Sequence, residues 1–139
     1  MPIQVLFLCT GNSARSQMAE HILNRLGGGR FIATSAGTEP RPVHPMTVRA
    51  LAEIDIDASQ AESKGLETCA GRKFDYVITV CDKARDQCPT FPGDTRRIHW
   101  SFDDPAAATG TEAERLKAFQ RIRGEITTRI RTWIAAVDK

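Results

Sequence analysis

The chain has 139 residues, the length of one ordinary domain, so we expect a single domain spanning residues 1–139. Its 41% hydrophobic residues suffice for a core, while 26% charged residues and a formal net charge of +2 give no electrostatic signature of nucleic acid or membrane as a partner. The longest apolar runs are strand-sized and the N-terminus lacks a secretion-signal pattern, so we expect a cytoplasmic monomer.

Four apolar runs have the character of buried strands. "IQVLFL" (3–8) and "FDYVITV" (74–80) are nearly continuous, as in strands covered on both faces, and "RFIATSAG" (30–37) and "RRIHWSF" (96–102) are weaker candidates. This alternation of strands and helices predicts an α/β fold of three layers, with a four-stranded parallel sheet flanked by helices. The apolar residues at helical spacing are Met18, Ile22, Leu23 and Leu26, then Val48, Leu51, Ala52 and Ile54, and finally Leu116, Phe119, Ile122, Ile126, Ile130, Trp133 and Val137.

The stretch "CTGNSARS" (9–16) lies between the first expected strand and a helix, at the sheet edge where doubly wound domains bind ligands. Its backbone N–H groups can converge on an anion, and Arg15 offers a planar fork of donors to a tetrahedral oxyanion. The same field stabilises the thiolate of Cys9, toward which Ser16 can donate. An inert thiol beside a solvated arginine is the alternative, which the C-x5-R-S spacing disfavours. The expected oxyanion-binding residues are Thr10, Gly11, Asn12, Ser13, Ala14, Arg15 and Ser16.

The other cysteines need separate interpretations, because a chain without an export signal favours catalytic, redox or metal chemistry over structural disulfides. If the first and third strands are neighbours, about 4.8 Å apart, Cys81 comes near Cys9. Seven helical steps from Cys81 to Cys88 span about 10.5 Å, whereas a disulfide needs α-carbons within about 7 Å. The segment between them must therefore loop or unwind to join them. A zinc site is the alternative, but one C-x6-C pair is weak evidence for it, and Cys69 is interpreted as structural.

Three segments carry a family resemblance that covers nearly the whole chain. "VLFLCTGNSARSQMAE" resembles the signature loop of the low-molecular-weight protein tyrosine phosphatases and of the arsenate reductases that share their fold. "VITVCDKARDQCP" resembles the C-x6-C segment of the thioredoxin-coupled arsenate reductases, and "GTEAERLKAFQRIRGEI" is similar to the last helix of the reductases. The resemblance implies arsenate reduction for arsenic detoxification through a relay of Cys9, Cys81 and Cys88. Thioredoxin would be the reductant, no cofactor would be needed, and phosphate or sulfate would act as analogues of arsenate.

The segment "HWSFDDPA" adds an acid to this resemblance. In the family the aspartate before the proline is the general acid, which implies Asp104, while Asp103 would help to shape the loop. An ordinary Asp-Pro turn would be the better interpretation if these residues stood alone. The following "DPAAATG" lacks the aromatic residues that line a phosphotyrosine groove in the phosphatases. We therefore expect a pocket suited to a small inorganic anion.

Two positions depart from the family pattern. Ala14 stands where many relatives carry a second cysteine, so protective pairing within the loop is not available. Some reductases of this type bind potassium through oxygen ligands, and Asn12, Glu20 and Ser35 match that pattern, but Lys64 stands where an acidic ligand would be. An ammonium near Glu20 could replace the ion, so we expect no required metal. A solvated surface lysine is the alternative interpretation of Lys64.

No shared spacing joins the histidines at positions 21, 44 and 99, so we expect them to have core or surface roles rather than to form a site. Trp100 and Trp133 lie in apolar patterns and are interpreted as packing residues.

Two other functions stay open at this point. The first is a phosphatase of the same fold that uses Cys9, Arg15 and Asp104 without a relay. The second is a noncatalytic oxyanion or redox sensor, in which Cys81 and Cys88 switch a partner surface. A sensor would bind an oxyanion without consuming a reductant.

Overall fold

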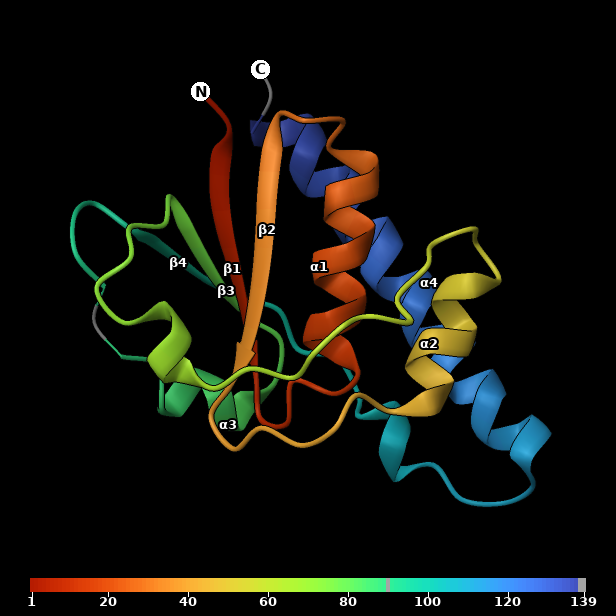
Figure 1. The fold of residues 1–139 in the computed structure, drawn as a ribbon. Coiled ribbons are helices and arrows are strands. Elements are labelled where there is room, and N and C mark those ends of the chain that lie inside the picture. The colour runs from red at the N-terminus through yellow and green to blue at the C-terminus, as the bar shows by residue number, and fades with distance from the viewer. Residues whose placement is uncertain (90, 138–139) are drawn as a thin grey trace.

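The computed structural model describes residues 1–89 and 91–137 and contains one parallel sheet (Figure 1). The strand order is β2-β1-β3-β4, with β1 paired to β2 along its full length and to β3 along its second half. The expected fold class is confirmed, including the adjacency of the first and third strands. The strands are β1 (Ile3–Cys9), β2 (Phe31–Gly37), β3 (Tyr76–Thr79) and β4 (Arg96–His99).

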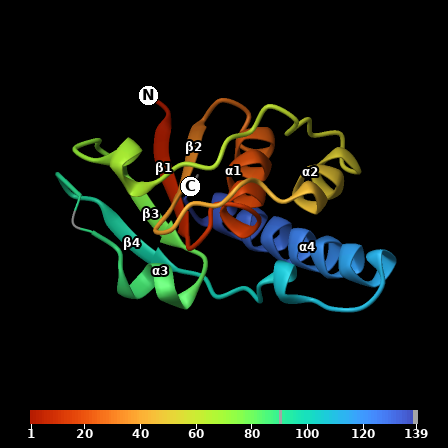
Figure 2. The ribbon, with the colours of Figure 1, turned by 60° about the horizontal axis from the view of Figure 1, so that its bottom comes forward.

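The helices cover both sides of this sheet. The long helices α1 and α4 lie side by side on one side of the strands, and α2 packs outside them against α4 (Figure 1). Helix α3 follows β3 at the carboxyl edge of the sheet, where it contacts β1 and β3, and it lies away from α2, as the turned view in Figure 2 also shows. The helices are α1 (Arg15–Leu26), α2 (Pro45–Ala52), α3 (Asp82–Asp86) and α4 (Glu112–Val137), with 3₁₀ turns at Leu66–Cys69 and Pro105–Ala107.

The core lies around β1, whose residues from Val5 to Leu8 are fully buried, as a strand covered on both faces requires. The Trp100 ring packs against the rings of Phe7 and Trp133, with centroids 6.1 Å away in both cases. The two tryptophans are therefore packing residues, as their apolar surroundings in the sequence indicated. Aromatic contacts of this kind join the sheet to α4 and hold the strands in place below their carboxyl ends.

Three element ends differ from the sequence expectation. Helix α2 ends at Ala52, because the chain turns at Asp55 with a φ of +63°, and Ile54 lies outside the helix. Strand β4 ends at His99 instead of residue 102, and the chain then leaves the sheet toward the loop that carries the two aspartates. The third strand is shorter than the run 74–80 at both ends. These ends depend on tertiary contacts, which the apolar runs do not encode.

All four strands run in one direction, so their carboxyl ends meet at one edge, at the bottom of Figure 1. The residues that follow β1, β3 and β4 are the loop 10–14, the cysteine at position 81 and the segment 100–104. The three segments with the predicted chemistry are thus brought to one edge of the sheet.

Candidate active site

The loop after β1 is held in place through its carbonyl groups, which accept hydrogen bonds from a neighbouring segment. The N–H groups of the segment after β2 donate to these carbonyls at 2.8–3.1 Å. Because successive carbonyls point outward, the N–H groups of the loop are free to face the pocket, as anion binding requires. The donor and acceptor pairs are Thr38 to Cys9, Glu39 to Thr10, Arg41 to Gly11 and His44 to Ser13.

The close approach of β2 to this loop requires a glycine at position 37. A β-carbon on Gly37 would lie 2.5 Å from the Thr10 carbonyl oxygen and 2.9 Å from the Asn12 nitrogen, and both are backbone atoms. Any side chain at position 37 would therefore displace the loop that lines the anion pocket.

Asn12 is the centre of a hydrogen-bond network beneath the loop. It has a left-handed φ of +50°, which asparagine tolerates better than most residues, and it is fully buried. Its Nδ2 donates to the Oγ atoms of Ser16 and Ser35, both at 2.8 Å. Its Oδ1 accepts from the Lys64 backbone N–H at 2.8 Å and from Gln17 Nε2 at 3.1 Å. Every polar atom of this side chain is satisfied, so the loop is fixed in one conformation.

The Cys9 thiol lies at the floor of the pocket and is 2% exposed. Its Sγ is 2.8 Å from Ser16 Oγ and accepts from the Asn12 backbone N–H at 3.3 Å. Ser16 Oγ also accepts from the Asn12 amide, and its hydroxyl hydrogen is available to donate to the sulfur. Two hydrogen-bonding groups therefore converge on the Cys9 sulfur.

A pocket of about 250 Å³ opens above Cys9. The Arg15 guanidinium on its wall is held by a hydrogen bond from Nη1 to the Phe102 carbonyl at 3.1 Å. No side chain caps the start of α1, so the N–H groups of its first turn are available to a ligand. No aromatic residue is among the described residues that line the pocket, in agreement with the expectation of a small anion. The lining residues are Cys9, Thr10, Gly11, Ser13, Ala14, Arg15, Arg41, Asp104 and Ala106.

The two aspartates of the segment after β4 point in different directions. Asp104 lines the pocket, with its Oδ2 3.8 Å from Arg15 Nη2 and its side chain 44% exposed. Its Oδ1 accepts from the Ala106 N–H at 3.0 Å and begins the 3₁₀ turn. Asp103 instead pairs with Arg121 of α4 at 3.1 Å. Asp104 is thus the one of the two that lines the pocket, and Asp103 ties the segment to α4.

Arg41 is a pocket residue that the sequence interpretation missed. Its side chain lines the mouth of the pocket, and its N–H bonds to the Gly11 carbonyl. The available signal was its place in the segment that follows β2, since this segment emerges at the same sheet edge as the loop after β1. Arg41 adds a second positive charge where an oxyanion would enter.

The remaining cysteines occupy three different surroundings. The Cys81 Sγ lies 3.3 Å from Thr10 Oγ1, directly beside the anion loop, and Cys81 is 5% exposed. Cys88 is half-buried just beyond α3, and burial raises the pKa of its thiol. Cys69 is fully buried in the core, in keeping with the structural role expected for it.

Helix α3 is held by side-chain contacts at its first turn. His99 of β4 contacts Asp82 through Nε2 at 2.9 Å and Thr79 through Nδ1 at 2.7 Å. Lys83 pairs with Glu39 of the segment after β2. The histidines share no site, as expected, but the sequence did not indicate that His99 ties α3 to the sheet. A five-residue helix has little stability of its own, so these contacts keep it folded.

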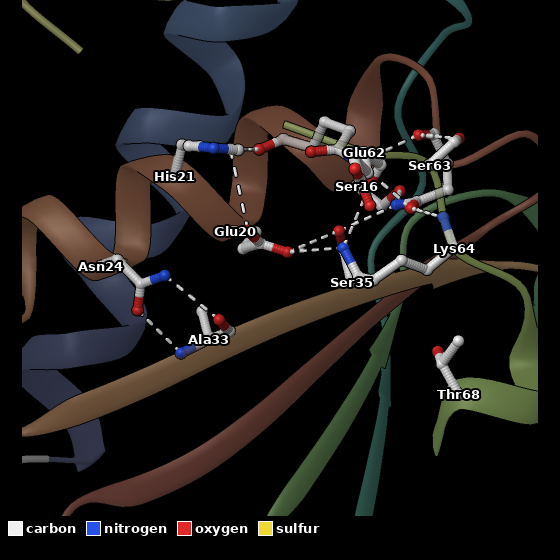
Figure 3. Close-up of polar contacts among 12 residues, drawn as sticks. Ser16, Glu20, His21, Asn24, Ala33, Ser35, Glu62, Ser63, Lys64 and Thr68 are labelled. Carbon is white, nitrogen blue, oxygen red and sulfur yellow. Dashed lines mark hydrogen bonds and ion pairs between the residues drawn. The ribbon is translucent and has the colours of Figure 1, made fainter. Parts of the chain in front are cut away.

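Lys64 extends the network beneath the loop toward the surface (Figure 3). Its ammonium is 3.6 Å from Glu20 Oε1 and 3.3 Å from the Glu62 carbonyl. Ser35 of β2 donates to the same Glu20 oxygen at 2.7 Å. Lys64 is therefore an ion-pair partner of Glu20 and not a solvated lysine. Within residues 1–89 and 91–137, no group of three His, Cys, Asp or Glu side chains is arranged to hold a metal ion.

The thiol of Cys9, the guanidinium of Arg15 and the carboxylate of Asp104 line one pocket, as a phosphatase-type site would require. Residues 4–139 match the low molecular weight phosphotyrosine protein phosphatase family, and the chain belongs to this family. Across the described residues, no helix is long and apolar enough to cross a membrane.

The chain is also similar to proteins named as arsenate reductases. It is 45% identical to one from Halalkalibacterium halodurans over 129 residues, which cover 93% of each chain. A solved structure of an arsenate reductase in the phosphate-binding state matches with a TM-score of 0.75 and 30% identity, over 96% of this chain and 98% of that one. A thioredoxin-dependent arsenate reductase of Corynebacterium glutamicum matches with a TM-score of 0.76 and 32% identity, over 99% of this chain and 63% of that one.

Proposed function

We propose that the protein reduces arsenate to arsenite, with Cys9, Cys81 and Cys88 as a disulfide relay and thioredoxin as the reductant. The observation that carries this proposal is the second thiol at the anion loop, with Cys81 Sγ only 3.3 Å from the Thr10 hydroxyl. A simple phosphatase has no use for a thiol there. The similarity to named arsenate reductases, one of them thioredoxin-dependent, supports the same conclusion.

The first step takes place in the pocket above Cys9. Arsenate is held by the loop N–H groups and by Arg15, whose guanidinium neutralises its negative charge. The Cys9 thiolate attacks arsenic and forms a sulfur–arsenic bond, while one arsenic–oxygen bond breaks. Asp104 protonates the departing oxygen, which leaves as water. The half-exposed position of Asp104 lets it take up a proton from solvent before each cycle.

The second step reduces arsenic. Cys81 attacks the Cys9 sulfur, so a Cys9–Cys81 disulfide forms and the sulfur–arsenic bond breaks. The electron pair of that bond stays on arsenic, which leaves as arsenite. Two thiols have been oxidised to one disulfide and As(V) has been reduced to As(III), so the electrons balance.

The third step moves the disulfide outward. The Cys88 thiolate attacks Cys81, a Cys81–Cys88 disulfide forms, and Cys9 leaves as a thiolate. Helix α3 lies between the two cysteines, at residues 82–86, and would loosen for this step so that their α-carbons come within about 7 Å, as a disulfide needs. Thioredoxin, a dithiol reductant, then reduces the exposed disulfide.

The test is arsenate-dependent consumption of NADPH with thioredoxin and thioredoxin reductase. Wild type and a matched Cys69→Ala control are expected to turn over continuously. Cys88→Ser is expected to release arsenite once and then stop, because its Cys9–Cys81 disulfide cannot move outward. Normal cycling of Cys88→Ser would overturn the relay.

The same assay separates the two other functions. No arsenate turnover, with hydrolysis of an aryl phosphate intact, would leave a phosphatase that uses Cys9, Arg15 and Asp104. Phosphate or arsenate binding without either activity would leave an oxyanion sensor.

A further inference from the structure

The resolving thiol Cys88 raises a chemical problem. It must act as a thiolate to attack a disulfide, yet it is half-buried and burial raises its pKa. Cys88 does not lie at the positive end of a helix, because α3 ends before Cys88 and its positive end lies at Cys81. A positive side chain beside the thiol would favour its thiolate form.

A second pocket, of about 220 Å³, lies beside Cys88 between α3 and the strands β3 and β4. It is separate from the anion pocket, since no residue lines both. Three of its lining residues are basic side chains, which gather around the one thiol. The lining residues are Val77, Thr79, Arg85, Cys88, Arg97, Ile98 and His99.

Arg97 of β4 is joined to Cys88 through a shared acceptor. Arg97 Nη2 donates to the Pro89 carbonyl at 2.9 Å, and the Cys88 thiol is directed to the same carbonyl oxygen at 3.6 Å. The Arg97 guanidinium and the Cys88 thiol therefore both approach the Pro89 carbonyl oxygen. The charge of Arg97 acts on Cys88 in the direction opposite to burial and lowers its pKa.

The side chains of the other two basic residues already contact carboxylates. Arg85 pairs with Asp86 at 3.2 Å, and His99 contacts Asp82 at 2.9 Å. Among residues 1–89 and 91–137, no carboxylate lies within ion-pair distance of Arg97. Arg97 is an exposed residue whose side chain lines the pocket beside the thiol.

We propose that Arg97 is the charge partner of Cys88, a positioning residue that stabilises the Cys88 thiolate for its attack on the Cys9–Cys81 disulfide. In this step the Cys88 proton goes to solvent, the Cys81–Cys88 bond forms and the Cys9–Cys81 bond breaks. Cys9 takes the displaced electron pair as a thiolate, so there is no net change of redox state.

The charge effect can be tested without arsenate, so its failure is distinct from a failure of the proposed reductase activity. In the full chain with Cys9→Ser and Cys81→Ser, the alkylation rate of Cys88 by iodoacetamide is measured across a pH series, with the modified peptide identified by mass spectrometry. Arg97→Met is expected to move the midpoint to higher pH and to slow alkylation at neutral pH about three- to tenfold. At about 1 M salt, where the Debye length is about 3 Å, the difference from the parent should shrink.

Two matched variants decide whether charge is the cause. Arg96→Met removes an exposed arginine from the neighbouring position on β4, whose side chain does not line the pocket, and should leave the midpoint unchanged. Arg97→Lys keeps the charge and should keep most of the effect. Equal midpoints for Arg97→Met and Arg96→Met would overturn the proposal. So would an Arg97→Lys variant that behaves like Arg97→Met, because the contact to Pro89 and not the charge would then be responsible.

The consequence for turnover rests on the proposed function. In the thioredoxin assay, Arg97→Met should lower kcat several-fold and leave KM for arsenate unchanged, because Arg97 does not touch the anion pocket. Rapid quenching should show the Cys9–Cys81 disulfide accumulating in this variant. A fall in kcat without such accumulation would contradict a role for Arg97 in the transfer to Cys88.

Discussion

The surroundings of Cys9 and of Cys88 are built in opposite ways. They are called here the rigid seat (residues 9–16) and the movable seat (residues 82–88). Cys9 lies at the end of a buried strand, in a loop whose carbonyls and asparagine side chain all have partners. Cys88 follows a five-residue helix, of which only Ala84 is buried. The first seat is fixed before substrate arrives, and the second is held by a few surface contacts.

This difference corresponds to two chemical demands. A nucleophile that must meet an oxyanion benefits from donors that are already in place, since reorganisation during the reaction would cost free energy. A thiol that must carry a disulfide outward needs a segment that opens at low cost, and low local burial allows this. One fold therefore provides a rigid thiol and a movable one at the same sheet edge.

The largest effect should follow from breaking the rigid seat with Asn12→Ala. The change removes the side chain that tolerates φ +50° and leaves buried partners at Ser35 and at the Lys64 N–H unsatisfied. We expect a loss of about 3 kcal/mol in the free energy of unfolding, together with weaker phosphate binding. Thermal unfolding and calorimetric titration measure the two effects. An unchanged melting temperature would show that the network does not hold the loop.

A smaller effect should follow from loosening the movable seat with Asp82→Asn. This variant weakens the contact from Asp82 to His99 that ties α3 to β4. Amide exchange in residues 82–88 should speed up about fivefold, equivalent to about 1 kcal/mol of local stability, while global stability changes by less than about 0.5 kcal/mol. Hydrogen-exchange mass spectrometry resolves the segment.

Asp86→Asn is the matched control for this experiment, because the Asp86 carboxylate pairs with Arg85 of the same helix and not with the sheet. If both variants accelerate exchange equally, the His99 contact is not what holds α3.

The smallest effect concerns the ion pair between Lys64 and Glu20, at the outer edge of the network around Asn12. Lys64→Met removes the ammonium 3.6 Å from Glu20, and we expect a loss of about 0.5 kcal/mol of stability because the pair is partly exposed. A double-mutant cycle with Glu20→Gln isolates the pair energy. Additive losses in the double variant would mean that Lys64 and Glu20 are not coupled.

The sequence predicted the rigid seat better than the movable one. Cys9, Arg15 and Ser16 lie within eight consecutive residues that join the end of β1 to the start of α1, so their spacing alone indicated that they meet. The hub at Asn12 joins residues 23 and 52 positions away, and only the packing of β2 and the following segment brings them together.

The contacts of α3 were missed for the same reason. His99 and Asp82 are 17 positions apart, and their meeting depends on the order β1-β3-β4 in the sheet. Arg97 also carries no motif of its own. The structure places Arg97, but not Arg96, among the residues that line the pocket beside Cys88.

The pairing of β1 with β3 also makes the thiols a reporter of correct folding. Leu8 pairs with Thr79, and the Val80 N–H donates to the Leu8 carbonyl at 2.8 Å, which brings Cys81 beside Thr10. A slip of one residue would turn the Cys81 side chain to the opposite face of the sheet. Misaligned chains would then fail to form the Cys9–Cys81 disulfide on mild oxidation, so the yield of this crosslink counts the correctly registered molecules in a refolded sample.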